Sequence, residues 1–230
     1  MVERLIIGPM YTNTYIVSIA KKECIVIDPG ADPGFIKASL DKINMTPKAI
    51  IFTHGHIDHT SGAKALQRAY KEKEPNLLVW MHEADFPFLD PDNSQRDQLN
   101  RLFLPGDNPE ADRVFEDLYQ DLPHIDSFLS HGDIIPETDL QVIHTPGHTP
   151  GSICLYSEER SALFTGDTLF FDAIGRSDFP GADEQVLMES IQTKLLVLPH
   201  ETRIFPGHGP FSTIERELRD NQMKTDHGML

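Results

Sequence analysis

The chain has 230 residues, 39% of them hydrophobic and 24% charged, which is enough to bury a core and fits a globular protein. Its formal net charge of -16 argues against a nucleic-acid partner, because a polyanion requires a basic face and no cluster of Lys or Arg suggests one. No apolar run approaches the length needed to span a membrane, so no membrane partner is expected.

The two cysteines, Cys24 and Cys154, each lie inside an apolar run typical of a strand. We therefore expect reduced core thiols rather than a disulfide, which favours a reducing compartment. The N-terminal residues Met1-Val2-Glu3-Arg4 have neither a basic start nor a following long apolar stretch with a small-residue cleavage site. These features together predict a cytoplasmic protein.

The N-terminal part of the chain alternates between strand-like and helix-like patterns. Asp32 followed by Pro33 predicts a helix start with Asp32 as the N-cap, and Ile36, Leu40 and Ile43 would form the buried stripe of that helix. Apolar runs bounded by turn residues predict strands around it. The elements expected here are strands over 2–7, 14–19, 24–27, 49–52 and 77–81, the helix after residue 32, and a helix over about 60–72.

Residues 84–131 interrupt this alternation with a strongly acidic, partly helical stretch. Asn108-Pro109-Glu110 resembles a helix start, and Leu99, Leu102 and Phe103 suggest a second short helix. We interpret the stretch as an insertion that covers one edge of the fold. A mobile lid over the site is the alternative, since long insertions are often functional.

The C-terminal part returns to strands and then adds helices. Asp183 is expected to cap a helix with one apolar face, and Ser212-x-x-Glu215 has the pattern of a capping box for a closing helix. Strands are expected over 140–143, 152–156, 162–165 and 203–205. No repeat, low-complexity tract or Ser/Gly linker appears, so the sequence favours a single layered α/β domain over residues 1–230.

One motif dominates the sequence: Thr53-His54-Gly55-His56-Ile57-Asp58-His59, directly after the apolar run that ends at Phe52. Three histidines and an aspartate just past a strand end suit a metal-binding loop far better than a packed core. Alternate spacing lets His54 and His56 converge on one point, while the adjacent Asp58 and His59 can turn toward another. Imidazole and carboxylate ligands without a thiolate suit zinc, iron or manganese.

Three further candidate ligands lie in turns after predicted strands. His148 lies in His-Thr-Pro-Gly-His-Thr-Pro-Gly, Asp167 in Phe-Thr-Gly-Asp-Thr, and His208 in Pro-Gly-His-Gly-Pro. Glycines beside each candidate permit tight turns and leave room around an ion. His144, four residues before His148, is interpreted as a structural, hydrogen-bonded turn residue.

These ordered motifs, over residues 13–212, resemble those of the metallo-β-lactamase-fold hydrolases, and most closely the short glyoxalase II-like (hydroxyacylglutathione hydrolase) branch. The resemblance implies an α/β (α+β) fold, a four-layer αββα sandwich with the site along one edge of the sheets. It implies that His54, His56 and His148 bind one metal, that Asp58, His59 and His208 bind a second, and that Asp167 bridges both. By the same resemblance, Asp28 supports the ligands from behind.

The implied cofactors are two divalent ions, with Zn²⁺ expected and Fe or Mn as alternatives. Two metals held roughly 3.5–4 Å apart can hold a hydroxide between them at neutral pH and polarise a substrate carbonyl. A thioester such as S-lactoylglutathione suits such a site, because its thiolate leaving group needs little protonation. Asp58 and Asp167 are the candidate catalytic residues, and Asp58 could serve both as a ligand and in proton handling.

Two features depart from the longer glyoxalase II enzymes. Only 22 residues follow His208, so a C-terminal helical domain that holds glutathione is not expected. The Gly-Lys-x-Tyr loop of those enzymes corresponds to Gly175-Arg176-Ser177-Asp178, in which the tyrosine is missing. Arg176 is the expected cation for a substrate carboxylate. A structural ion pair between Arg176 and Asp178, or another nearby acid, is the alternative.

The expected partner is thus a small acyl-thiol substrate, and the sequence does not indicate an oligomeric state. A persulfide dioxygenase with one iron is an alternative, because such enzymes share the fold and carry a Gly-Arg-x-Asp loop. A lactonase or other ester hydrolase is another. The nucleases of the superfamily fit less well, given the acidity of the chain. A non-enzymatic scaffold would have no reason to keep seven mutually consistent ligands.

Overall fold

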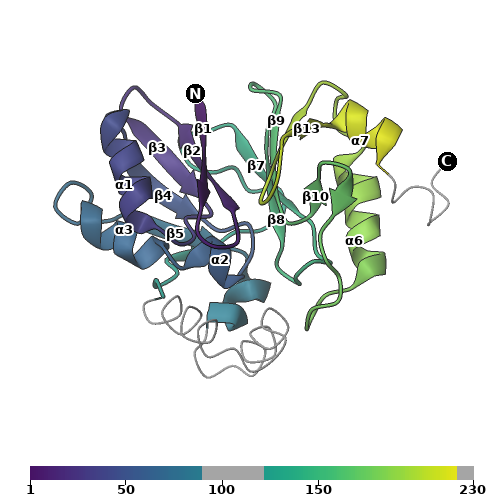
Figure 1. Cartoon of the computed structure of the whole chain (residues 1–230), viewed down its shortest axis with the longest axis horizontal. Coiled ribbons are helices and arrows are strands. Elements are labelled where there is room, and N and C mark those ends of the chain that lie inside the picture. The colour runs from purple at the N-terminus through teal and green to yellow at the C-terminus, as the bar shows by residue number, and fades with distance from the viewer. Residues whose placement is uncertain (90–121, 222–230) are drawn as a thin grey trace. The chain divides into compact units, whose positions relative to one another are not determined.

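The computed structural model describes residues 1–89 and 122–221, so the two helices expected inside the acidic stretch lie outside the described residues. The chain divides into two compact units, Met1–Phe128 and Leu129–Leu230. Each unit combines a β-sheet with packed helices (Figure 1), which confirms the predicted α/β class. In the described ranges no helix has both the length and the apolar character required to cross a membrane.

Within the described part of the first unit, one sheet carries its strands in chain order. The strands are β1 (Val2–Ile7), β2 (Thr12–Ser18), β3 (Glu23–Ile27), β4 (Thr46–Ile51), β5 (Leu78–Met81) and β6 (Ser127–Phe128). The first three are antiparallel neighbours, whereas β3, β4, β5 and β6 run parallel. The carboxyl ends of β3, β4 and β5 therefore lie at one edge of the sheet, and β2 begins at that edge because Tyr15 pairs with Ile27.

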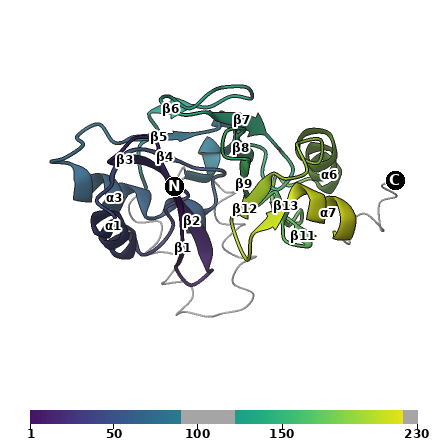
Figure 2. The same cartoon turned by 90° about the horizontal axis from the view of Figure 1, so that it is seen from above.

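Helices α1 (Pro33–Lys42) and α3 (Ala63–Tyr70) pack on this sheet, as Figures 1 and 2 show. Ile36 and Leu40 of α1 are fully buried and Ile43 packs against the same core, as the apolar spacing predicted. Asp32 is the N-cap of α1 and Pro33 is its first residue, as predicted, but the Asp32 side chain makes no capping hydrogen bond. Asp32 adopts a left-handed conformation with φ of 60°, and its carboxylate accepts from the backbone N of Gly8 instead of capping the helix.

Two short helical segments follow strand ends in the first unit. The single turn α2 (Ile57–Thr60) falls inside the histidine motif, and the 3₁₀ helix η1 (Glu83–Leu89) follows β5. Asp85, Phe88 and Leu89 of η1 are buried. The start of the acidic stretch is therefore part of the packed unit, which its charge pattern did not indicate.

The second unit contains a sheet with the strand order β13-β12-β9-β8-β7 among its described residues. These strands are β7 (Leu140–His144), β8 (Ile153–Ser157), β9 (Ala162–Gly166), β12 (Arg203–Pro206) and β13 (Ser212–Thr213). A small hairpin is formed by β10 (Leu169–Phe170) and β11 (Ala173–Ile174). Strands β9 and β12 are parallel, and β7 shares their direction because β8 is antiparallel to both β7 and β9.

Helix α6 (Glu184–Ser190), its continuation as the π-helix η2 (Ile191–Leu195), and helix α7 (Ile214–Asp220) cover this sheet. Asp183 caps α6 as predicted, and its carboxylate accepts from the Val186 N at 3.1 Å. The capping box expected at Ser212 is wrong by one residue. Thr213 is the N-cap of α7, and the Ser212 hydroxyl instead donates to the buried carboxylate of Glu217.

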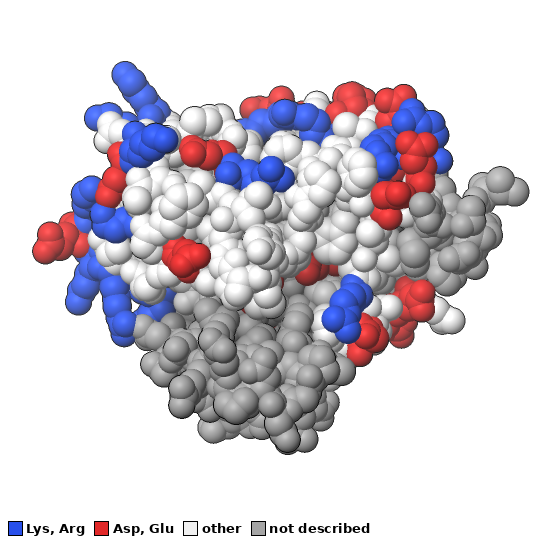
Figure 3. Space-filling model, in the orientation of Figure 1, with Lys and Arg blue, Asp and Glu red and all other residues white. Residues whose placement is uncertain are grey.

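Both cysteines are free and fully buried, as expected of core thiols. Burial raises the pKa of the Cys24 thiol to about 12 and that of Cys154 to about 11, so neither is a nucleophile at neutral pH. On the face seen in Figure 3, basic side chains are interspersed with acidic ones rather than gathered in one patch.

Candidate metal centre

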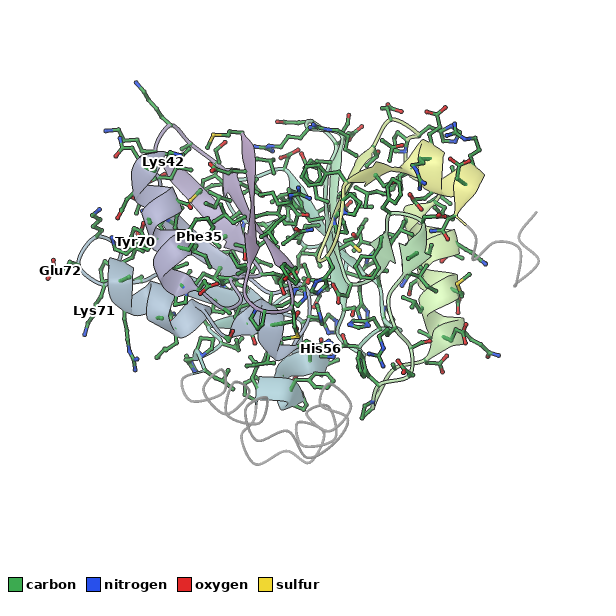
Figure 4. All side chains as sticks on the ribbon, viewed as in Figure 1. Phe35, Lys42, His56, Tyr70, Lys71 and Glu72 are labelled. Carbon is green, nitrogen blue, oxygen red and sulfur yellow. The ribbon has the colours of Figure 1, made fainter. Side chains whose placement is uncertain are left out.

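Three consecutive loops of the first unit leave the carboxyl ends of its parallel strands at the same edge. Asp28 follows β3, the segment Thr53–His59 follows β4, and Asp85 follows β5. Figure 4 shows His56 at this end of the strands, away from Lys42 and Tyr70 on the helical side. Side chains separated by dozens of residues in the sequence therefore meet because the strands run parallel.

Asp28 is buried and binds the histidine motif through both carboxylate oxygens. Oδ1 accepts from the Thr53 N at 2.7 Å, while Oδ2 accepts from Thr53 Oγ1 at 2.6 Å and faces His59 Nδ1 at 2.9 Å. The nearest ligand atoms of Asp28, His54 and His59 all lie within 4.8 Å of one another. The supporting position implied for Asp28 thus corresponds to direct contact with the motif.

The tautomers of two histidines follow from these contacts. Because the Thr53 hydroxyl donates to Asp28, its oxygen lone pair accepts from His54 Nδ1 at 3.1 Å. The His59 Nδ1 likewise donates to Asp28. Both rings therefore carry their proton on Nδ1 and keep the Nε2 lone pair for a metal. The rings of His54 and His56 lie 4.6 Å apart in an edge-to-face arrangement, which brings the alternate histidines together.

Asp58 and His59 are neighbours on α2, and their ligand atoms face one another. His59 Nε2 lies 3.3 Å from Asp58 Oδ2. The same Oδ2 accepts a hydrogen bond from Thr12 Oγ1 at 2.9 Å, so the first residue of β2 orients the carboxylate. Thr12 was not singled out from the sequence, because its proximity depends on β2 starting at the edge where β3 ends.

The second unit gathers its three candidate ligands around one carboxylate. Asp167 Oδ2 lies 3.7 Å from His148 Nε2 and 3.6 Å from His208 Nε2. These separations are too long for hydrogen bonds, but two ligands of one tetrahedral ion, each about 2.0–2.2 Å from the metal, lie about 3.3–3.6 Å apart. All three residues follow β7, β9 or β12, whose carboxyl ends share one edge.

The loop that follows β11 packs directly on two of these ligands. A side chain at Gly175 would place its Cβ 1.8 Å from the Asp167 carbonyl oxygen, so only glycine fits there. The next carbonyl, that of Arg176, accepts from His148 Nδ1 at 2.8 Å and leaves Nε2 facing Asp167. The sequence indicated Arg176 for its side chain, whereas its backbone carbonyl holds a candidate ligand.

The Arg176 guanidinium forms a bidentate ion pair with Asp178, at 2.9 and 2.7 Å, and lies over the Phe179 ring. This hydrogen bonding lowers the pKa of the Asp178 carboxyl. Both charged side chains are more than half exposed, so the pair contributes little to stability. His144 does not face this cluster. Its Nε2 lies 2.9 Å from the Pro150 carbonyl, and burial lowers its pKa, which fits the structural role expected of it.

The donor chemistry of the seven predicted ligands suits divalent metal. The first unit supplies three imidazoles and one carboxylate, and the second supplies two imidazoles and one carboxylate. Such nitrogen and oxygen donors suit zinc, iron and manganese, so the donor types alone do not distinguish these metals. Beyond these seven, the structure adds Thr12 and Asp85 as residues that contact the motif, and Thr53 as the motif residue whose hydroxyl donates to Asp28. The sequence feature that could have indicated Asp85 is the position of this acid shortly after a strand, β5.

Comparisons with known proteins agree with this chemistry. The family model of the metallo-beta-lactamase superfamily matches residues 7–208. The curated hydroxyacylglutathione hydrolase GloC of Haemophilus influenzae is 32% identical over 209 residues, which cover 87% of each chain.

Two solved structures are similar over nearly their whole length. The BLEG-1 B3 metallo-beta-lactamase is 32% identical with a TM-score of 0.80, covering 98% of this chain and 100% of that one. A di-iron-bound form of TTHA1623 is 32% identical with a TM-score of 0.79, covering 96% of this chain and 99% of that one. These similarities extend to both units of the chain, because each alignment spans almost all of it.

Proposed function

Because the chain belongs to the metallo-beta-lactamase superfamily, as a metallo-hydrolase, we propose that it hydrolyses a thioester of a small acyl-thiol. S-Lactoylglutathione is the first substrate to test, since the similar GloC protein is named a hydroxyacylglutathione hydrolase. The proposal includes two divalent ions per chain. The di-iron form of the similar TTHA1623 makes iron a candidate beside zinc.

The proposed ligands are the seven side chains that the sequence indicated. The set is His54, His56, Asp58, His59, His148, Asp167 and His208. One observation carries the proposal: Nδ1 of His54, His59 and His148 is each held by an oxygen of the protein. Such partners fix the tautomer and raise the basicity of a histidine that ligates metal through Nε2.

Ions bound by these ligands would supply a water-derived nucleophile at neutral pH and polarise the thioester carbonyl. The chain's own residues would orient the ligands and accept the proton that the attacking water gives up. Thr12 donates to Asp58 Oδ2 and so orients this carboxylate, which would serve both as a metal ligand and in proton handling. Asp28 and the Arg176 carbonyl keep their histidines in the ligating tautomer. The thiolate leaves without a dedicated acid.

Arg176 is the proposed contact for an acidic group of the substrate. Its guanidinium is exposed and already holds one carboxylate, that of Asp178, in the bidentate geometry that a substrate carboxylate would require. A substrate would therefore compete with Asp178 for this cation. The Gly-Arg-x-Asp loop also occurs in persulfide dioxygenases, so the same loop is the reason to test oxygen chemistry alongside hydrolysis.

The test is metal analysis of protein purified without chelator, followed by two assays on the same sample. S-Lactoylglutathione hydrolysis is followed by thiol release, and oxygen uptake is followed with glutathione persulfide. We expect close to two metal equivalents and thiol release without oxygen consumption. One iron per chain with persulfide-dependent oxygen uptake would instead identify a dioxygenase. Turnover of lactones or simple esters with no thioester turnover would assign a different hydrolase.

A further inference from the structure

Asp85 is a buried carboxylate that the ligand motif alone does not account for. It lies in η1, the 3₁₀ helix that follows β5, and its side chain is fully buried. Its Oδ2 accepts a hydrogen bond from the backbone N of Gly55 at 2.8 Å. Gly55 is the residue between His54 and His56, so this bond ties η1 to the centre of the histidine motif.

The contact between η1 and the motif is close as well as polar. A Cβ at Gly55 would lie 2.9 Å from the Asp85 carbonyl oxygen and 2.9 Å from the Phe88 Cβ. The Phe88 ring also meets the His56 ring edge-to-face, with centroids 5.6 Å apart. Residue 55 therefore has to be small, because η1 rests on its backbone.

Two buried carboxylates consequently accept hydrogen bonds from the motif backbone on either side of His54. Asp28 binds the N–H of Thr53, the residue before His54, and Asp85 binds the N–H of Gly55, the residue after it. Hydrogen bonds from backbone N–H groups to carboxylates are charge-assisted and directional. These two bonds restrain the backbone on either side of His54, through the peptide units that contain the Thr53 N and the Gly55 N.

We infer that Asp85 is a positioning residue for the metal-binding loop, holding the Gly55 backbone so that His54 and His56 are preset for an ion. The inference rests on the metal-binding part of the proposed function and is independent of which substrate is cleaved. Groups hydrogen-bonded to a metal ligand typically contribute about 10–100-fold to metal affinity, and this scale is taken for Asp85, which acts through the backbone between two proposed ligands.

The test measures zinc affinity by competition with a chromophoric chelator, together with unfolding of the metal-free protein. We expect Asp85→Ala to weaken zinc binding by about 10–100-fold. Asp85→Asn keeps an oxygen that can accept from the Gly55 N, so it should lie closer to the wild type than Asp85→Ala. The control is Asp126→Ala, which removes an exposed carboxylate of this unit that also accepts from a backbone N, that of Val79 at 2.8 Å.

The control separates positioning from general stability. Asp126→Ala should lower the unfolding midpoint of the metal-free protein while leaving zinc affinity within about threefold of the wild type. Equal zinc affinities for Asp85→Ala and wild type, or equal losses for Asp85→Ala and Asp126→Ala, would overturn the inference. Failure of the wild-type protein to bind zinc, iron or manganese would overturn it too.

A second pair of variants keeps the test decisive if Asp85→Ala does not fold. Gly55→Ala disturbs the same contact from the other side, whereas Gly34→Ala adds a methyl group where no atom lies within 4 Å. We expect Gly55→Ala to weaken zinc binding at least tenfold and Gly34→Ala to leave it unchanged. Unchanged zinc affinity in Gly55→Ala would refute the positioning role. Because all readouts are metal affinities, failure of thioester hydrolysis would leave this result intact.

Discussion

Replacing Asp28 by Asn tests whether the chain sets the tautomer of His59. The native carboxylate receives three donors, the Thr53 N, Thr53 Oγ1 and His59 Nδ1, at 2.7, 2.6 and 2.9 Å. Asparagine has nearly the same shape but offers an amide NH₂ in place of one acceptor oxygen. Asp28 has a positive φ of 52°, which asparagine tolerates, so the substitution adds little backbone strain.

The consequence falls on His59. If the amide oxygen stays on the Thr53 N, the NH₂ group faces His59 Nδ1, which meets it as an acceptor only when the ring proton moves to Nε2. A protonated Nε2 has no lone pair for a metal, yet this atom is the one that faces Asp58. If the proton returns to Nδ1, the ring faces an amide NH₂ and lacks the wild-type hydrogen bond to a charged carboxylate, which is worth about 1.5–3 kcal/mol. At 1.4 kcal/mol per factor of ten, zinc affinity should fall about 10–100-fold.

The assay is zinc competition with a chromophoric chelator at neutral pH, with Asp126→Asn as the control. Asp126 also accepts from a backbone N–H, that of Val79, at 2.8 Å. The control should bind zinc like the wild type. If Asp28→Asn binds zinc within about twofold of the wild type, the tautomer argument fails, and Asp28 acts only in local packing.

Three further predictions concern single side chains. Arg176→Ala should raise KM for an acidic thioester about ten- to a hundredfold and leave kcat and metal content unchanged. Asp178→Asn should lower the same KM, because it removes the carboxylate that competes with the substrate for Arg176. Equal effects on a neutral thioester would contradict both expectations. Asp167→Asn should cost more activity than the 10–100-fold typical of a group that only contacts a metal ligand, whereas Asp172→Asn should cost little. Similar losses in both variants would contradict the proposed bridging role of Asp167. Glu217→Ala should destabilise the metal-free protein by about 3–5 kcal/mol, measured by denaturant unfolding. The reason is the loss of a buried carboxylate that accepts hydrogen bonds from Ser212, Arg216, Asp172 and Asn221. A change below about 1 kcal/mol would show that these donors find other partners.

The sequence was most informative where function depends on residues close together in the chain. His54, His56, Asp58 and His59 lie within six positions, so their clustering needs no knowledge of tertiary structure. The strands around them were found because their apolar runs are bounded by clear turn residues. The predicted ends of these strands were less accurate than their existence. Strand β2, for example, begins at Thr12 rather than at residue 14, and this shift brings Thr12 to Asp58.

What the sequence could not supply depends on strand order. Asp85 reaches Gly55 because β4 and β5 are parallel neighbours, and no local pattern reveals that pairing. The acidity of residues 84–131 instead suggested an insertion that covers one edge of the fold. The misplaced cap at Ser212 has a related cause, since Glu217 is buried and attracts the Ser212 hydroxyl, leaving Thr213 to cap α7. The contact of the Arg176 carbonyl with His148 was invisible because main-chain groups carry no sequence signature.

That carbonyl contact has a consequence for how the protein could diversify. The His148 ring is held by the main chain of residue 176, whereas the guanidinium of the same residue points to Asp178. A change of side chain at 176 therefore leaves the hydrogen bond to His148 available, provided that Gly175 keeps the loop close to Asp167. Changes at positions 176 and 178 that alter the substrate should therefore leave the His148 ring in its place. A combinatorial library at these two positions, screened first for zinc retention and then for turnover, should yield many metal-loaded variants with altered substrate preference.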